Sequence, residues 1–134
     1  MRILIAEDDF ASRKFMLKFL SKYAEVDATV DGQEAAAAFE LALEDKTPYD
    51  LVCLDIMMPN MNGIEALQAI RGLEKEFNVD RNSRARVIMT TALNEVKQVD
   101  QAFDLGCEGY AVKPIDTEKF LVIMEKMGLS INNQ

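Results

Sequence analysis

Five polar residues stand where short apolar runs of the sequence end. They are Asp8 and Asp9 after residues 2–6, Asp55 near the end of residues 51–56, Thr91 at the end of residues 87–91, and Lys113 after residues 110–112. Each one alone has an ordinary explanation in a turn or a helix cap. Their recurrence at the ends of four runs indicates a shared site, provided that the fold brings those ends together.

The chemistry that this set favours is the transfer of a phosphoryl group to an aspartate. Three carboxylates held close together repel one another, and Mg²⁺, a hard cation that prefers oxygen ligands, relieves that repulsion. Such a cation also neutralises phosphoryl oxygens, so that a neighbouring carboxylate is able to attack phosphorus. The ammonium group of Lys113 and the hydroxyl group of Thr91 would hold the remaining oxygens.

Apolar runs and amphipathic stretches alternate five times along the chain, and this alternation predicts the strands whose ends carry the five polar residues. We expect strands over 2–6, 26–30, 51–56, 87–91 and 110–112, and helices over 10–22, 33–44, 64–77, 94–105 and 117–127. The short connections predict an α/β fold, a doubly wound five-stranded parallel sheet with helices on both faces. The carboxyl ends of parallel strands share one edge, where such sheets bind ligands.

The remaining connection, residues 78–86, is polar and has no helical or strand periodicity. We interpret it as a solvated loop, and its arginines Arg81, Arg84 and Arg86 leave contact with an acidic partner open.

The composition excludes several classes of protein. The 134 residues carry a net charge of −8, which argues against binding of nucleic acids or anionic membranes. No apolar run reaches the length of about 18 residues that spans a bilayer, and the N-terminus becomes acidic too early for a signal peptide. The chain has no histidine, which removes histidine-based catalytic triads, and its two cysteines lie in apolar or helical patterns typical of buried thiols. We therefore expect a cytoplasmic protein of one domain over residues 1–134, with no output domain.

The whole chain resembles the receiver domains of two-component signalling, close to the stand-alone CheY-like type. The resemblance rests on Glu7-Asp8-Asp9, on Asp55 with Met57-Met58-Pro59 and Gly63, on Thr91-Ala92, and on Gly109-Tyr110 with Lys113-Pro114. It implies a strand order of 2-1-3-4-5, which is the order of CheY-like folds.

The resemblance also implies a role for each site residue. Asp55 would accept a phosphoryl group from a phosphohistidine of a sensor histidine kinase or a histidine phosphotransfer protein. Asp9 and Asp55 would bind Mg²⁺ directly, with Mn²⁺ as a substitute, Asp8 would act through water, and the backbone carbonyl of Met57 would complete the protein's ligands. We interpret Glu7 as a turn residue, or as a residue that contacts the ligands, rather than as a ligand itself, because side chains alternate along a strand.

On the opposite side of the phosphoryl group, Lys113 and Thr91 would bind its oxygens together with the backbone N–H groups of Met58 and Ala92. Tyr110 would turn inward when Thr91 is drawn to the phosphate, which would remodel the face formed by residues 94–127. The peptide bond between Lys113 and Pro114 is expected to be cis, a conformation found almost only before proline.

These roles predict a signalling phosphoacceptor that catalyses its own phosphorylation and slow dephosphorylation rather than an enzyme of metabolism. The phosphorylated form, a monomer or weak dimer, would bind a downstream target protein. An alternative is an intermediate receiver that passes the phosphate to a histidine phosphotransfer protein. An aspartate-nucleophile phosphatase is a weaker alternative, because the position two residues after Asp55, where it would want a second acid, is Met57.

Overall fold

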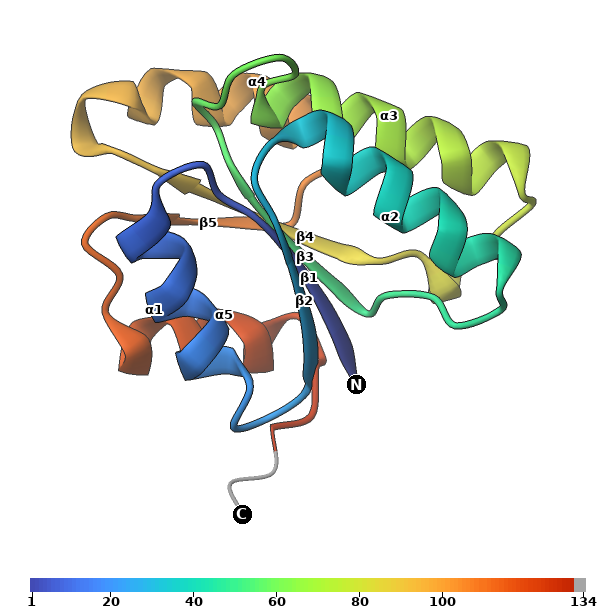
Figure 1. Cartoon of the computed structure of the whole chain (residues 1–134), viewed down its shortest axis with the longest axis horizontal. Helices are drawn as coiled ribbons and strands as arrows, with labels where there is room; N and C mark the ends of the chain where they lie inside the picture. The colour runs from blue at the N-terminus through green and yellow to red at the C-terminus, as the bar shows by residue number, and fades with distance from the viewer. Residues whose placement is uncertain (132–134) are drawn as a thin grey trace.

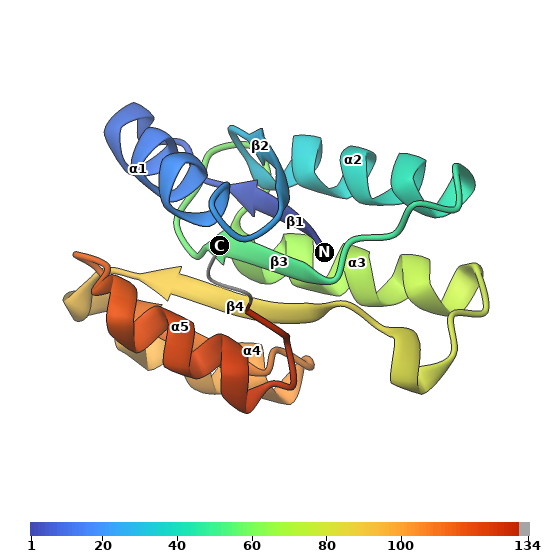
Figure 2. The ribbon, with the colours of Figure 1, turned by 90° about the horizontal axis from the view of Figure 1, so that it is seen from below.

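A parallel sheet lies between two layers of helices in the computed structural model, which describes residues 1–131 (Figures 1 and 2). The strands are β1 (Arg2–Ala6), β2 (Glu25–Thr29), β3 (Leu51–Asp55), β4 (Arg86–Thr91) and β5 (Gly109–Val112). The helices are α1 (Phe10–Leu20), α2 (Gly32–Glu44), α3 (Gly63–Glu76), α4 (Val99–Asp104) and α5 (Thr117–Lys126), with 3₁₀ helices η1 (Arg81–Ser83) and η2 (Leu93–Gln98). The strand order β2-β1-β3-β4-β5 and the parallel pairing confirm the predicted fold.

Each face of the sheet is covered by its own set of helices, so the strands are buried on both sides. Leu4, Val52 and Val87 pack on the side of α2, α3 and α4, whereas Ile3 and Ile88 pack on the side of α1 and α5. Successive side chains of a strand point to opposite faces, and burial of both faces explains why the strands read as nearly continuous apolar runs.

Four helices begin with a side chain that caps the exposed N–H groups of the first turn. The caps are Asp9, Asp31, Asn62 and Asp116, and each accepts a hydrogen bond from the backbone N–H three residues later. Asn62 and Glu65 form a reciprocal capping box at α3. These caps end the loops at the strand tips after a few residues and so hold those loops close to the sheet edge.

The predicted helix over residues 94–105 is divided in the structure. Residues 93–98 form the 3₁₀ helix η2, and only Val99–Asp104 is α-helical. Neither Ala92 nor Gln98 supplies a side-chain cap, so the orphan N–H groups of the first turn have no such partner and the tighter 3₁₀ geometry appears. The other boundaries differ from the prediction by a few residues at most, and the predicted cis bond between Lys113 and Pro114 is present. No helix within residues 1–131 combines the length and the apolar character that crossing a bilayer requires.

Candidate functional site

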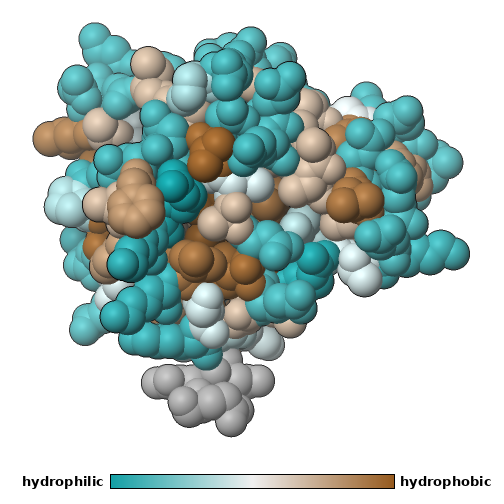
Figure 3. Space-filling view, in the orientation of Figure 1, coloured by the Kyte–Doolittle hydropathy of each residue, from teal (hydrophilic) through white to brown (hydrophobic). Residues whose placement is uncertain are grey.

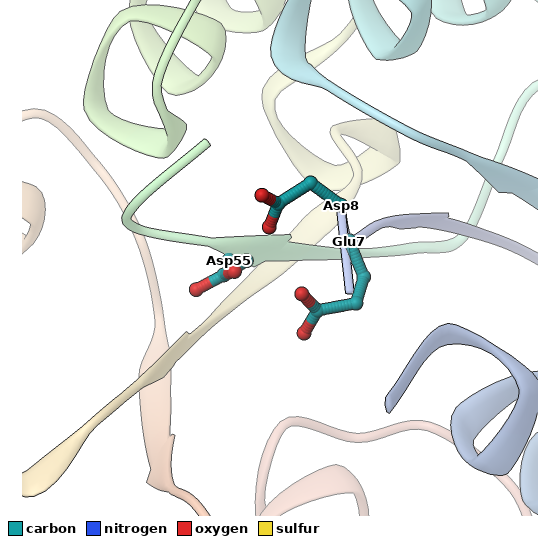
Figure 4. Close-up of side chains that lie close together, drawn as sticks. All are labelled: Glu7, Asp8 and Asp55. Carbon is teal, nitrogen blue, oxygen red and sulfur yellow. The ribbon is translucent and has the colours of Figure 1, made fainter. Parts of the chain in front are cut away.

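Three carboxylates converge at the carboxyl edge of the sheet. Asp55 is the last residue of β3, and Glu7 and Asp8 directly follow β1, which pairs with β3 so that Ala6 lies opposite Leu54. One oxygen from each of the three side chains lies within 4.8 Å of the other two, and the carboxylates point toward one another (Figure 4). Among residues 1–131, this is the group of acidic side chains whose arrangement suits a metal ion.

Lys113 brings a positive charge to the same cluster from the tip of β5. Its Nζ lies 2.5 Å from Oε1 of Glu7 and 3.2 Å from Oδ2 of Asp55. Burial lowers the pKa of Lys113, but the hydrogen bond to Glu7 and the charges of both acids outweigh burial and raise the pKa above its ordinary value. The lysine therefore stays protonated between two carboxylates.

The environment of Asp55 disfavours its charged form. Burial, followed by the hydrogen bond and the negative charge of Glu7, raises the pKa of Asp55 to about 7, although Lys113 acts in the opposite direction. The side chain belongs to a residue that is only 6% exposed. A divalent cation with oxygen ligands suits this set, because it would offset the crowding of negative charge that Lys113 alone does not neutralise.

The structure places Asp9, the expected direct metal ligand, at the start of α1 and outside the acidic cluster. Asp9 is the N-cap of α1, and its carboxylate accepts a hydrogen bond of 2.9 Å from the backbone N–H of Ser12, which lowers its pKa. It is not a member of the cluster around Asp55. The strand ends at Ala6, so the second acid of the triplet, Asp8, is the one that reaches over the sheet edge.

The side chain of Glu7 belongs to the same cluster. It is buried, pairs with Lys113 and lies within reach of Asp55 and Asp8. The sequence held a signal for this arrangement, because Asp9 immediately precedes the amphipathic pattern of α1, the position that N-cap residues occupy. Assigning Asp9 to the cap leaves Glu7 and Asp8 as the acids at the tip of β1.

The other predicted residues lie on β4 and β5 or in the loops that follow β3 and β4. Thr91 is fully buried, and its hydroxyl donates to the carbonyl of Ala92 at 3.1 Å. Tyr110 is 40% exposed, with its ring edge-on to Phe103 at a centroid distance of 6.4 Å. Met58 lies in the loop that follows Asp55. The ring of Tyr110 therefore faces outward in this structure.

Two contacts that sequence reasoning missed hold the loop after Asp55. Asp31, the cap of α2, accepts a hydrogen bond of 2.8 Å from Nδ2 of Asn60, and the backbone N–H of Gly32 donates to the carbonyl of Met61. The loop also returns tightly to the strand, since a Cβ atom at Gly63 would lie 2.3 Å from the carbonyl oxygen of Asp55. Only glycine fits there without displacing the backbone that carries Asp55.

A cavity of about 290 Å³ opens beside the cluster, between α1 and the segment that follows β5. Glu7, Thr90 and Lys113 line its polar side, and its apolar lining is formed by Ala11, Phe15, Met16, Pro114 and Ile115. The space-filling view shows apolar surface between α1 and α5 on this face of the molecule (Figure 3). The cluster thus has an apolar rim on one side.

Comparison with known proteins gives the same fold and the same type of domain. The response regulator receiver domain family matches residues 3–125. The chain is 34% identical over 122 residues to the chemotaxis protein CheY of Treponema pallidum, covering 90% of this chain and 77% of that protein. It is 32% identical over 136 residues to hybrid signal transduction histidine kinase L of Dictyostelium discoideum, covering 99% of this chain but only 8% of the kinase.

The solved structures agree with the sequences. A CheY chain in the CheX-CheY-BeF3-Mg+2 complex from Borrelia burgdorferi superimposes with a TM-score of 0.81 at 28% identity, covering 97% of this chain and 90% of that one. The strand order, the strand-tip residues and the match over nearly the whole chain lead to one conclusion. The chain belongs to the family of response regulator receiver domains.

Proposed function

We propose that the chain is a phosphorylation switch in which Asp55 accepts a phosphoryl group from the phosphohistidine of a sensor histidine kinase or a histidine phosphotransfer protein. The observation that supports this most directly is the position of Lys113, whose Nζ lies 3.2 Å from Oδ2 of Asp55 in a cluster of three carboxylates. A lone buried ion pair would not gather two further acids at a strand edge that ligands reach.

In the proposed reaction an oxygen of Asp55 bonds to phosphorus while the bond between phosphorus and the histidine nitrogen breaks, and the leaving imidazole is protonated. Lys113 is placed to balance negative charge on a phosphoryl oxygen. The Thr91 hydroxyl is able to turn from the Ala92 carbonyl toward a second oxygen. The backbone N–H groups of Met58 and Ala92 are the further donors that the proposal assigns.

Asp8, Asp55 and the backbone carbonyl of Met57 are the groups that would hold Mg²⁺, or Mn²⁺ in its place. When bound, the cation would neutralise phosphoryl oxygens and favour the ionised form of Asp55. Glu7 is the carboxylate that pairs with Lys113 and holds its ammonium group beside Asp55.

The apolar cavity beside Lys113 supports docking of a phosphohistidine protein on this side of the site. Phe15, which lines this cavity, and Phe10, also on α1, are 46% and 67% exposed, and a docked partner would cover this apolar surface. A downstream target would instead use the face formed by α4, β5 and α5, where Leu93 and Tyr110 are exposed.

A relay function is the second candidate, and the likeness to a hybrid histidine kinase over 99% of the chain favours considering it. In that case phosphate on Asp55 would move to a histidine phosphotransfer protein, with no change in affinity for a target. Incubating the chain, radiolabelled with phosphate on Asp55, with a purified phosphotransfer domain distinguishes the two roles, because only a relay transfers the label.

The test of the proposal is phosphorylation by a small phosphodonor, with and without Mg²⁺, followed by intact-mass measurement. Wild type is expected to gain one phosphoryl group, labile to alkali and to hydroxylamine as an acyl phosphate is, only with the metal, and Asp55→Asn none. Asp104→Asn, which alters an aspartate on α4, serves as the matched control and should behave as wild type. Phosphate on Asp55→Asn, or incorporation that is independent of metal, would overturn the proposal.

A further inference from the structure

A second cavity lies at the other end of the sheet from the phosphorylation site. It has a volume of about 550 Å³ and is formed by the carboxyl-terminal half of α3, the connection to β4 and Leu105 after α4. Since α3 runs back along the strands, its end reaches the edge where β4 begins, whereas the tips of β3 and β4 point the other way (Figure 2). This cavity therefore shares no residue with the site around Asp55.

Three cationic side chains around this cavity have no anionic partner among residues 1–131. Lys75 lies in α3, Arg81 in η1, and Arg84 directly after η1. None of the three forms an ion pair within this described part of the chain. Nε of Arg84 is buried and has no hydrogen-bond partner. A buried donor without an acceptor is costly, so a movement of this side chain that gives the guanidinium an acceptor in the cavity is favoured.

The remaining charges of the cavity wall are already neutralised. Arg71 donates to Glu74 at 2.7 Å and to Glu108 at 3.0 Å, and its other N–H groups bond to backbone carbonyls. The second oxygen of Glu74 accepts from the N–H of Ala85 at 2.7 Å. The unpaired charge on the lining of the cavity is therefore positive, although the net charge of the chain is −8.

We propose that this cavity binds a small anion that carries two linked phosphate groups. Two guanidinium groups offer paired donors that match phosphate oxygens, and the ammonium of Lys75 adds a third charge from the facing helix. A volume of about 550 Å³ exceeds what a single phosphate fills. Val79 and Leu105 line the cavity without an aromatic side chain beside them, so recognition rests on the phosphates rather than on stacking of a base.

The test is titration of the ¹⁵N-labelled full chain with inorganic pyrophosphate in a metal-free buffer of constant ionic strength. Saturable shifts of backbone signals are expected around Gly72, Val79 and Leu105, with weaker binding of orthophosphate. Lys75→Gln/Arg81→Gln, a pair of exposed residues whose change leaves the fold intact, should weaken binding by about tenfold or more. Adding Arg84→Gln should weaken it further.

The matched control is Lys46→Gln/Lys126→Gln, which removes the same charge from exposed positions outside the cavity lining. This variant should bind as wild type does. Shifts that never saturate, an equal loss in the control, or shifts centred on Asp55 and Lys113 would overturn the proposal. Saturable shifts at these positions with a short polyglutamate peptide but not with pyrophosphate would also overturn it, in favour of an acidic protein partner.

Discussion

The three consecutive acids after β1 differ in role. Replacing a carboxylate by an amide tests this difference. Asp8→Asn removes a charge from the cluster around Asp55 and is expected to abolish most Mg²⁺-dependent phosphorylation. Asp9→Asn keeps a side-chain oxygen for the N–H of Ser12, since asparagine caps helices as well as aspartate does. The rate of phosphorylation by a small phosphodonor at several Mg²⁺ concentrations measures both.

Asp8→Asn and Asp9→Asn also show which of the two aspartates is the metal ligand. A loss of Mg²⁺ dependence in Asp9→Asn with normal behaviour of Asp8→Asn would restore Asp9 as the metal ligand. Thermal unfolding of both variants is the control, because a general loss of folding would lower both rates together.

The position of a site residue was predictable from the sequence where a proline marks the end of a strand, and it was ambiguous where no such marker is present. Asp55 is followed by Met57-Met58-Pro59 and Lys113 by Pro114, so their positions at the strand tips followed from the sequence. The triplet Glu7-Asp8-Asp9 has no such marker, and a shift of one residue changes which side chain faces the cluster. In the structure β1 ends at Ala6, and the acids in the cluster with Asp55 are Glu7 and Asp8.

Tyr49 predicts a dependence of stability on alkaline pH. Burial, with the hydrogen bond to Asp27, raises the pKa of Tyr49 to about 12 in the folded chain. The unfolded chain releases this proton at a pH of about 10, so the contribution to stability is complete below that pH and is lost as the pH rises through about 12.

We therefore expect the free energy of unfolding of wild type to fall more steeply between these pH values than that of Tyr49→Phe. Urea unfolding at a series of pH values measures the difference, and Tyr23→Phe is the control with a second tyrosine. Parallel pH profiles for wild type and Tyr49→Phe would contradict the expectation.

At the scale of elements, periodicity predicted which segments are helical but not their internal geometry. Residues 64–77 have strong apolar periodicity and a capping box, and α3 spans nearly that range. Residues 94–105 have the periodicity without a cap, and the structure divides them into η2 and α4. A pattern of apolar residues reports burial, whereas the hydrogen bonds of the first turn depend on caps and on neighbouring elements.

Arg71 joins three elements, and its loss is expected to be costly. Its guanidinium connects α3 to the carbonyls of Ala85 before β4 and Gly106 after α4, and it neutralises Glu74, whose side chain is 2% exposed. Arg71→Met would leave a buried carboxylate without its cation, and removal of one partner of a buried pair costs about 3 kcal/mol or more. Denaturant unfolding measures this loss.

Arg81→Met is the control at an exposed arginine, where a change within about 0.5 kcal/mol is expected. The double variant Arg71→Met/Glu74→Met should recover part of the lost stability, since it removes the stranded charge as well. Equal effects of Arg71→Met and Arg81→Met would show that the network does not hold the three elements together.

At the scale of the whole molecule, the strand tips connect the proposed phosphorylation site to a face on the far side of β4. Thr91 lies at the tip of β4 and pairs in register with Val112 of β5, two residues after Tyr110. Thr91 is fully buried, and the strand that carries it pairs with β3, which ends at Asp55, on one side and with β5 on the other. The segment that would respond, η2 with α4, lacks side-chain caps at both starts. Weakly held elements of this kind are the ones that switches move.

The predicted response is an inward movement of the Tyr110 ring when the site is loaded. In the present structure the ring is 40% exposed against Phe103, and the Thr91 hydroxyl donates to the carbonyl of Ala92. Beryllofluoride with Mg²⁺, acting as a phosphoryl analogue, should draw Thr91 toward Asp55 and open space behind β4 that the ring then fills.

Fluorotyrosine labelling and ¹⁹F NMR measure this movement, because the chain has only three tyrosines and Tyr110→Phe assigns the relevant signal. The Tyr110 signal is expected to shift with beryllofluoride and Mg²⁺. The Tyr49 signal should stay in place, because Tyr49 is only 5% exposed and is packed in the core on the side of α2 and α3. Thr91→Ala removes the hydroxyl that links the two sites, so its Tyr110 signal should remain at the unliganded position even though the analogue still binds. An equal shift in Thr91→Ala would mean that the face responds through another route, and an unchanged signal in wild type would mean that loading the site leaves Tyr110 outside.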